Sequence, residues 1–558
     1  MPYNLLVDPL FPVVRRSGRT SLIRFTELTV ADDPPVDFCW PRPDFNIASY
    51  EFCIGVLSVA LSHISASNTV SLEDLWGNLP TAEDLASLVQ DIVPFFNLDG
   101  DGPLFMQDYE AFSRTEANDI DALLIDTPGV NGQNKNADLL THRHRYPAMG
   151  RAAAAMALYA LQQFAPSGGA GNRTSMRGGG PLTTLIIPGA NPGNPSTLWH
   201  RIIINVSQNF FSWDDPLARP ERVFPWVAPT LVSDKEHGER EVSEHDSAVH
   251  SAHAYFGMPR RIRLVFSNEQ GFCPLTGAED RLVTGFSQQP WGMNYGVWRH
   301  PLTPYRRQKE SDPPYSVKPK SGRFGYRDWV SVTFGQNEGK GALALPALNV
   351  EDASGDRANM ILHVYGSSIL RVAGWAMSNM EAMSYLWAEQ PLYLTDDKIL
   401  EDRLRNTAIG FANAGDAAHI ILRSALREAL FSDSAKPSLD AGLFDESRMA
   451  FYENTERAFH RALASLLEKP DQERAGLARS WLKEMQKVAG EIFQRVLPAP
   501  GRDPTLARRM ALAHGHMMAG FSGWGKAGER LFTTLQLPLP EKKAAKAKTK
   551  TKTKEKKS

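Results

Sequence analysis

The sequence predicts a mixed α+β protein: a large, irregular α/β N-terminal domain over residues 1–394, a C-terminal four-helix bundle over residues 395–540, and a disordered Lys-rich tail over residues 541–558. Before residue 395, short apolar runs alternate with loops rich in Pro, Gly, Asn and Asp, which is typical of strands and turns. After it, long segments almost free of internal proline carry apolar residues at spacings of three to four, as amphipathic helices do. A length of 558 residues also favours more than one domain.

The elements follow from the same patterns. In the N-terminal domain, four apolar runs are predicted strands and two long apolar segments are predicted helices. The strands cover residues 183–188, 201–206, 261–266 and 329–334, and the helices residues 45–64 and 148–165. The bundle helices are expected over residues 397–430, 446–469, 472–497 and 503–535.

Composition excludes several classes of protein. No run approaches about 18 apolar residues, and the first residues lack the apolar stretch of a signal peptide, so we expect a cytoplasmic protein with no membrane partner. The 3 cysteines are too few and too scattered for a disulfide framework or a Cys-rich metal site. We expect no cofactor and no structural metal.

Charge is concentrated at the C-terminal end. The net charge is −2, but residues 541–558 hold nine Lys against two Glu, or +7, which leaves −9 on residues 1–540. Such a tail cannot bury enough apolar surface to fold. It either attracts nucleic acid without sequence preference or serves as a solubilising terminus, and a nucleic-acid site elsewhere requires a local patch.

The glycine-rich segment 165–184 follows a predicted helix and precedes a predicted strand. A phosphate loop needs the opposite order, strand then glycines then helix, so this segment does not predict a nucleotide site. It is either a structural turn or a loop whose bare backbone enters a groove. In the second case Gly168, Gly169 and Gly171 present no side chain, and Arg173 and Arg177 supply phosphate contacts.

Several motifs together with this segment resemble one known family. They are RPDFN (42–46), LFMQD (104–108), DTPGVNGQNKNADLL (126–140), GMPRRIRL (257–264) and GVWRHPLTPY (296–305). In this order they resemble the large subunit of the type I-E CRISPR surveillance complex, Cascade (the CasA family). The resemblance implies an irregular α/β domain before a four-helix bundle. It also implies a non-catalytic subunit that recognises a protospacer-adjacent motif in double-stranded DNA and opens the duplex to start an R-loop. The implied partners are target DNA, the 5′ handle of the CRISPR guide RNA, other Cascade subunits and a helicase-nuclease.

The resemblance also places the sites. Ser167, Gly168, Gly169, Ala170 and Gly171 fall where the family reads the motif in the minor groove, whose degenerate pattern suits a tolerant reader. Ser378, Asn379 and Met380 fall at the tip of the family's wedge, although core packing is the plain alternative for Met380 and its neighbours Trp375 and Met377. Some relatives support the motif contact with a lysine, where this chain has Gln288 and Gln289.

The loop of residues 131–145 resembles the family loop that touches the guide handle and neighbouring subunits. Asn136, Leu139 and Leu140 lie in its anchoring stretch. The basic cluster that follows, which includes Arg143 and Arg145, either binds phosphate or is a solvated face. Some relatives carry a zinc-binding Cys cluster near Cys273, and this chain does not.

A competing hypothesis is a metal-dependent hydrolase. Four histidines lie close together in the sequence among acidic residues, which are the ligand types of hydrolytic metal sites. They are His237, His245, His250 and His253. Their spacing matches no helical His-Glu-x-x-His motif.

Overall fold

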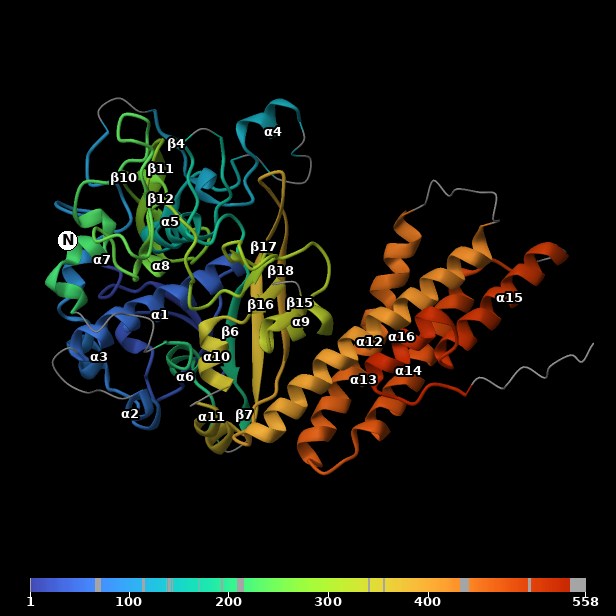
Figure 1. Ribbon diagram of the computed structural model, residues 1–558. Helices are drawn as coiled ribbons and strands as arrows, with labels where there is room; N and C mark the ends of the chain where they lie inside the picture. The colour runs from blue at the N-terminus through green and yellow to red at the C-terminus, as the bar shows by residue number, and fades with distance from the viewer. Residues whose placement is uncertain are drawn as a thin grey trace, which may run out of the picture. The chain divides into compact units, whose positions relative to one another are not determined.

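The computed structural model describes residues 2–65, 72–112, 116–136, 138, 142, 144–169, 171–191, 194–207, 215–339, 342–354, 357–431, 441–499 and 503–541. The chain divides into two compact units, Met1–Glu401 and Asp402–Ser558. The first mixes helices with several small sheets and the second is helical (Figure 1). The predicted mixed α/β content is therefore confirmed.

Helix α1 (Pro43–Ser65) is the central helix of the first unit. It is apolar on all sides and is buried at nearly every position to Leu61, which is typical of a core helix. Phe52 packs edge-on against Phe96, Phe105 and Tyr159, with ring centroids 5.7 to 5.8 Å apart. By length and mean hydropathy (1.5) α1 alone among the described helices would suffice to cross a membrane, but 83% of that apolar window is buried inside the protein.

An antiparallel sheet carries one of the two long hairpins of the first unit. Its order is β18 (Glu381–Leu392), β17 (Ser368–Ser378) and β6 (Thr183–Pro188). Strand β6 pairs with β17 only as far as Ala373, while β17 and β18 stay paired to Ser378 and Glu381. The end of the hairpin therefore projects beyond the third strand and rises toward α4 (Val130–Asn134) in Figure 1.

A second sheet supports the glycine-rich segment. In it β11 (Glu279–Gln289) lies between β10 (Arg261–Phe272) and β4 (Asn118–Asp119), and β5 (Met149–Gly150) also pairs with β11. The C-terminal end of β11 brings Gln288 and Gln289 next to the segment that follows α5 (Arg151–Phe164).

The remaining elements are short. The helices are α2 (Leu72–Gly77), α3 (Ala82–Val89), α6 (Leu198–Ile203), α7 (Pro220–Val223), α8 (His253–Phe256), α9 (Tyr326–Thr333), α10 (Leu348–Ser354) and α11 (Ala358–Tyr365). The strands are β1 (Phe11–Arg15), β2 (Thr20–Ile23), β3 (Pro35–Phe38), β7 (Ala190–Asn191), β8 (Asn194–Pro195), β9 (Glu241–Val242), β12 (Asn294–Tyr295), β13 (Tyr305–Arg307), β14 (Tyr315–Ser316), β15 (Gln336–Gly339) and β16 (Ala342–Leu345).

Two predicted strands are wrong. Residues 201–206 overlap helix α6, which is capped by Thr197 and whose Leu198, Trp199, Ile202 and Ile203 are all buried. Residues 329–334 overlap α9, in which the buried Tyr326, Trp329, Val330 and Thr333 follow the helical period. In both segments β-branched residues suggested strands, but helical burial outweighed this weak preference.

The second unit consists of long helices side by side (Figure 1). They are α12 (Lys398–Leu430), α13 (Ala441–Glu468), α14 (Arg474–Val496), α15 (Pro504–Phe521) and α16 (Gly525–Leu535). Their core includes Phe411 stacked on Trp481 at 6.0 Å between ring centroids, with Phe459 edge-on. The helix expected over 503–535 divides at Ser522–Trp524, where Gly523 has a φ of +89° that ends α15.

Candidate nucleic-acid interface

The glycine-rich segment forms a loop with a closed base. The Gly180 N–H donates to the Phe164 carbonyl at 2.9 Å, and a Cβ on Gly179 would lie 2.4 Å from the Pro166 Cα, so the two ends of the loop touch. The Lys318 ammonium and the Ser316 hydroxyl both donate to the Arg177 carbonyl. Burial and the charge of Arg177 lower the pKa of Lys318 to about 7. The base of the loop is thus tied to the core.

The tip of this loop is exposed. Ser167, Gly168 and Gly169 face solvent, and a Cβ built on Gly169 would meet no atom within 4 Å. Gly169 has a φ of +82°, a region that favours glycine. Ala170 lies outside the described residues. The structure therefore presents bare backbone at Gly168 and Gly169 and the short hydroxyl side chain of Ser167, three of the four described positions of the expected groove reader.

Gly171 is buried, whereas Gly169 is exposed. The Gly171 carbonyl accepts a hydrogen bond from the Trp291 N–H at 2.8 Å, and a Cβ here would lie 2.5 Å from the Pro290 Cβ. Arg173 continues this anchor, because its guanidinium lies 5.1 Å from the Trp291 ring centroid and donates to the Ser233 hydroxyl at 2.9 Å. Gly171 and Arg173 hold the loop against the residues that follow β11.

The side chains of Asn172 and Gln288 connect the tip to the sheet. Asn172 donates to the Gly168 carbonyl, and Gln288 donates to the Asn172 Oδ1 at 2.6 Å. Arg260 donates to the Pro166 carbonyl from the other side. Gln288 therefore supports the loop indirectly. Gln289 is half-buried, and its backbone pairs with Arg261 in β10.

Arg177 requires a correction. The sequence suggested a phosphate contact, but its side chain and that of Glu51 both have 0% exposure. The two Nη atoms donate to the two Glu51 carboxylate oxygens at 2.9 and 2.8 Å. Burial alone would lower the pKa of Arg177, and the Glu51 carboxylate raises it above its usual value. Arg177 is a core residue beneath the loop because its planar fork matches the buried carboxylate.

The end of the β17–β18 hairpin is a two-residue turn. Asn379 and Met380 both have positive φ values, +47° and +67°, as in the type I′ turns that suit hairpin twist. Ser378, Asn379 and Met380 are exposed, and Met380 reaches 59%. Trp375 is 9% exposed and packs in the core, and the half-buried Met377 packs against Gly180. Met380 is not a core residue.

The glycine loop and the hairpin tip meet. The Ser167 hydroxyl lies 3.4 Å from the Met380 sulfur, although 213 residues separate them in the sequence. The structure thus brings together two of the groups that the sequence predicted separately.

The expected guide-handle loop lies partly outside the described residues, which exclude Leu139, Leu140 and Arg143. Asn136 is exposed, with a φ of +50°. A Cβ on Gly132 in α4 would lie 3.9 Å from the Glu381 Oε1, so this segment begins beside the hairpin tip. Arg145 pairs with Asp126 at 3.0 Å and is about one-third exposed. Asp126 also pairs with the buried Arg42.

Comparison with known proteins assigns the chain to a family. A model of the CRISPR-associated protein Cse1 matches residues 4–492. The chain belongs to the Cse1 family. This confirms the resemblance to the large subunit of type I-E Cascade.

Solved Cse1-family structures have the same fold. CasA from Thermus thermophilus aligns with a TM-score of 0.65 at 16% identity, covering 93% of this chain and 100% of that one. Cse1 from Thermobifida fusca gives 0.65 at 14% identity, covering 96% and 98%. A chain solved in a CRISPR RNA-guided surveillance complex gives 0.63 at 15% identity, covering 93% and 99%.

The four histidines of the hydrolase hypothesis do not converge in this Cse1-family chain. Exposed His237 contacts Asp234, exposed His245 contacts Glu244 at 3.5 Å, and buried His253 contacts the Tyr295 hydroxyl at 3.1 Å. Burial lowers the pKa of His253 to about 3. Within the described ranges, no group of three His, Cys, Asp or Glu side chains is placed to hold one metal ion.

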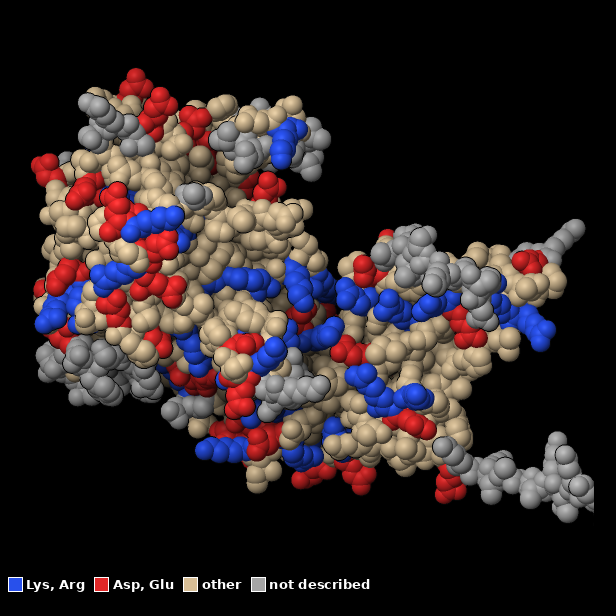
Figure 2. Space-filling model, turned by 45° about the horizontal axis from the view of Figure 1, so that its top comes forward, with Lys and Arg blue, Asp and Glu red and all other residues tan. Residues whose placement is uncertain are grey.

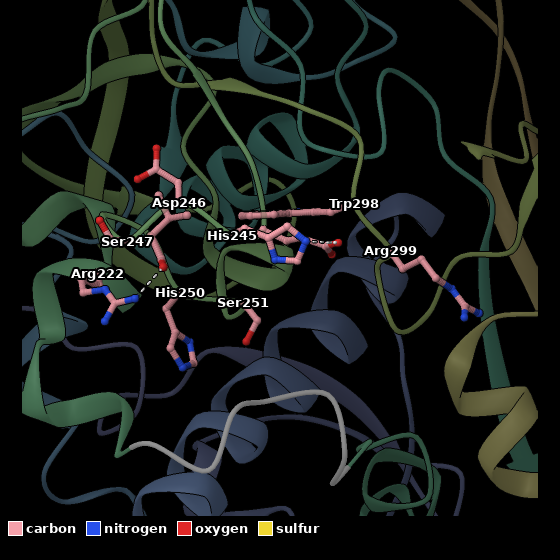
Figure 3. A pocket seen from close by; sticks show the side chains of 10 residues that line it. Arg222, His245, Asp246, Ser247, His250, Ser251, Trp298 and Arg299 are labelled. Atoms are coloured by element: carbon pink, nitrogen blue, oxygen red, sulfur yellow. Dashed lines mark hydrogen bonds and ion pairs between the residues drawn. The ribbon is translucent and has the colours of Figure 1, made fainter. Parts of the chain in front are cut away.

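Two of these histidines line a hollow. His245 and His250 lie in it with Asp246, Ser247, Arg222 and Trp298 (Figure 3). Arg222 donates to the Val249 carbonyl at 3.1 Å, and the His250 Nδ1 accepts from the Ala252 N–H at 3.1 Å. These contacts fix the loop conformation.

Sequence reasoning missed the residues that hold the glycine loop. Arg260 and Trp291 are remote from the loop in the sequence, whereas Asn172 lies within the glycine-rich segment itself, and each acts through a backbone contact or a ring face. Such contacts leave no spacing pattern. The one available signal was Pro290-Trp291 directly after Gln288-Gln289, a rigid pair beside the predicted support.

Proposed function

We propose that this Cse1-family chain reads the protospacer-adjacent motif and starts duplex opening within Cascade, without chemistry of its own. Ser167, Gly168 and Gly169 form the reading tip, and Asn379 and Met380 form the wedge. The single observation that carries the proposal is the 3.4 Å contact between Ser167 and Met380. A motif reader and a strand separator need to act on neighbouring base pairs, and these two exposed elements touch.

The shape of the reading tip suits a minor groove. That groove is about 6 Å wide and offers a degenerate pattern of acceptors, so it admits bare backbone more easily than side chains. The absence of atoms around Gly169 leaves room for the groove walls. Gln288 is a neutral residue bonded to Asn172, so it positions the tip and does not act as a second charged reader.

The hairpin tip suits a wedge. Met380 is an apolar, flexible side chain that is 59% exposed on a two-stranded projection. Inserting an apolar side chain at a base step costs a few kcal/mol of unstacking, which new contacts repay. The guide RNA then supplies sequence specificity by pairing with the opened strand, a division of work known from another RNA-guided effector.

The wider role follows from family membership. The proposed partners are target DNA, the guide RNA 5′ handle at the loop with Asn136 and Arg145, other Cascade subunits and a helicase-nuclease that cuts the DNA. The C-terminal helices serve, in the four-helix arrangement of the family, as a support for neighbouring subunits. The proposed compartment is the cytoplasm, where free thiols such as Cys39, Cys53 and Cys273 persist.

The test compares two glycines that have nearly the same backbone conformation. Gly169 and Gly18 have φ values of +82° and +85°, and a Cβ on either meets no atom within 4 Å. Gly169→Leu and Gly18→Leu therefore introduce similar strain and similar bulk at different places. Each variant is assembled into the complex and given target DNA with randomised bases beside the protospacer.

We expect the wild type and Gly18→Leu to select the same flanking motifs, and Gly169→Leu to lose the selection while still assembling. Selection unchanged in Gly169→Leu would remove the loop from the interface. A loss in both variants would mean that backbone strain, and not the bulk at the tip, is responsible.

A further inference from the structure

The helical unit contains a cavity of about 610 Å³ between α12, α13, α14 and α16. Its polar lining is basic or neutral, and no Asp or Glu lines it among the residues that the structure describes. The polar residues are Arg403, Asn406, Thr407, Asn413, Arg474, Thr534 and Gln536. A lining of this kind, with two cations and no anion, has a positive potential that favours an anionic ligand.

Arg474 is the distinctive residue of this cavity. Its Nε and Nη1 atoms are buried, and neither has a hydrogen-bond partner in the described part of the chain. Burial lowers the pKa of Arg474. Arg474 as a whole is half-buried, but burying two of its N–H groups without an acceptor is costly, since each unmade bond to a charged group forfeits its stabilisation. Its fork geometry fits two oxygens of a phosphate or carboxylate group.

Two neighbours, Gly410 and Arg403, shape the surroundings of this guanidinium. A Cβ on Gly410 in α12 would lie 2.8 Å from the Arg474 Nη2, so the glycine leaves the space that the guanidinium occupies. Arg403 donates to the Pro470 carbonyl and, at 3.1 Å, to the Gln472 carbonyl. These bonds hold the connection before α14, whose positively polarised N-terminus begins at Arg474.

We propose that this cavity binds a nucleotide-sized ligand, with its phosphate group on Arg474. The volume lies in the range of pockets that enclose small organic molecules and exceeds what a bare phosphate needs. The amides of Asn406, Asn413 and Gln536 offer donors and acceptors for a base or sugar, and Ile409, Leu466 and Leu477 offer an apolar wall. This site is independent of the proposed DNA-reading function, because all its residues lie in the second unit.

The test titrates the full chain by calorimetry at constant ionic strength with adenosine monophosphate, adenosine and inorganic phosphate. We expect saturable one-site binding of the monophosphate and at least about tenfold weaker binding of each fragment, because each lacks hydrogen bonds that the whole ligand makes. Absence of saturable monophosphate binding overturns the proposal. Equal affinity for inorganic phosphate overturns the nucleotide-sized ligand.

Variants then locate the site. Arg474→Met should lower the monophosphate affinity about tenfold or more, while Arg479→Met, an exposed arginine on the same helix, should not. Because Arg474→Met risks misfolding, Gly410→Ala gives a second readout. Its methyl group displaces the guanidinium yet favours the helix. Gly490→Ala, a helical glycine with open space around its Cβ, is the matched control. Unchanged affinity in Gly410→Ala or in folded Arg474→Met overturns the assignment.

Discussion

At the residue scale, two arginines of one glycine-rich segment have opposite environments. Arg173 is half-buried and stacks on Trp291, whereas Arg177 is enclosed with Glu51. Glu51 lies on α1, 126 residues before Arg177, so nothing in the local sequence indicated the pair. The Thr183 hydroxyl also donates to the Glu51 Oε1, at 2.7 Å, which completes the buried network.

Arg177→Ala should lower the free energy of unfolding by about 3 to 5 kcal/mol, because it leaves the Glu51 carboxylate buried without its partner. Denaturant unfolding of the full chain measures this. The double variant Arg177→Met with Glu51→Met should recover most of the loss, since neither charge then remains. If the single variant is as stable as the wild type, the pair does not support the loop.

Asp37 ties three elements together and predicts a pH dependence. Its Oδ2 accepts from Arg371 at 2.8 Å and from Arg201 at 2.9 Å, and its Oδ1 accepts from the Tyr50 hydroxyl at 2.8 Å. Burial would raise the pKa of Asp37, but the charges and hydrogen bonds of Arg371 and the other donors hold it below its usual value of 3.8. The ionised carboxylate therefore stabilises the fold above that pH.

Asp37→Asn should destabilise the protein at pH 7 by about 2 to 3 kcal/mol, the size of hydrogen bonds to charged groups. The pKa of Asp37 is lower in the folded state than in the unfolded state. The stabilisation is therefore complete above pH 3.8 and disappears as the pH falls below 3.8 and through the lower, folded-state pKa. The difference between wild type and variant should narrow over this range in melts at several pH values. A constant difference would show that charge is not its source.

At the element scale, the hairpin tip places an L-residue where glycine is preferred. Met380 has a φ of +67° and is 59% exposed, so its side chain contributes little burial while its backbone is strained. A type I′ turn favours Asn-Gly, and Asn379 already stands in the first position. We infer that a methionine stands at position 380 because of its function and not because it stabilises the turn.

Met380→Gly should therefore raise the stability by about 1 kcal/mol and, at the same time, slow R-loop formation on intact duplex DNA. The rate should recover on DNA with an opened bubble beside the motif, where the unstacking cost has already been met. R-loop kinetics on both substrates and a thermal melt separate these effects. Equal slowing on duplex and bubble would contradict a wedge.

The sequence predicted long elements better than short ones. The length of the apolar run indicated helix α1, the helices of the second unit carry enough periodic positions to show their type, and β6 and β10 are correct. Segments of six residues failed where helical burial decided the outcome, as in α6 and α9. The candidate site was predicted from residue types at exposed tips, but the anchors Asn172, Arg260 and Arg177 depend on contacts with residues that are distant in the sequence.

At the scale of the whole molecule, charge is distributed unevenly along the chain. On the face of the first unit seen in Figure 2, acidic and basic side chains are interspersed, and no broad basic field covers it. Nine lysines lie in residues 541–558, against a net charge of −9 on residues 1–540. The tail therefore carries the densest positive charge in the sequence, and in the proposed DNA-binding role it would contribute long-range attraction.

Deleting residues 541–558 should weaken non-specific DNA affinity of the complex and flatten its dependence on salt, because fewer counterions are released. The preferred motif should stay the same. Binding measured from low to physiological salt with and without target motif tests both statements. A changed motif preference would mean that the tail takes part in reading.

The anchored glycine loop also has a kinetic consequence. Its base is closed by the Gly180–Phe164 bond, and hydrogen bonds within the chain to Trp291 and from Asn172 hold the two sides of the tip. A tip that is already in shape loses little conformational entropy on entering a groove. In the proposed DNA-reading role, each encounter with DNA is then decided by orientation and diffusion, without a slower internal rearrangement. A complex built this way can inspect and release wrong sites quickly, so the speed of its search follows the viscosity of the medium.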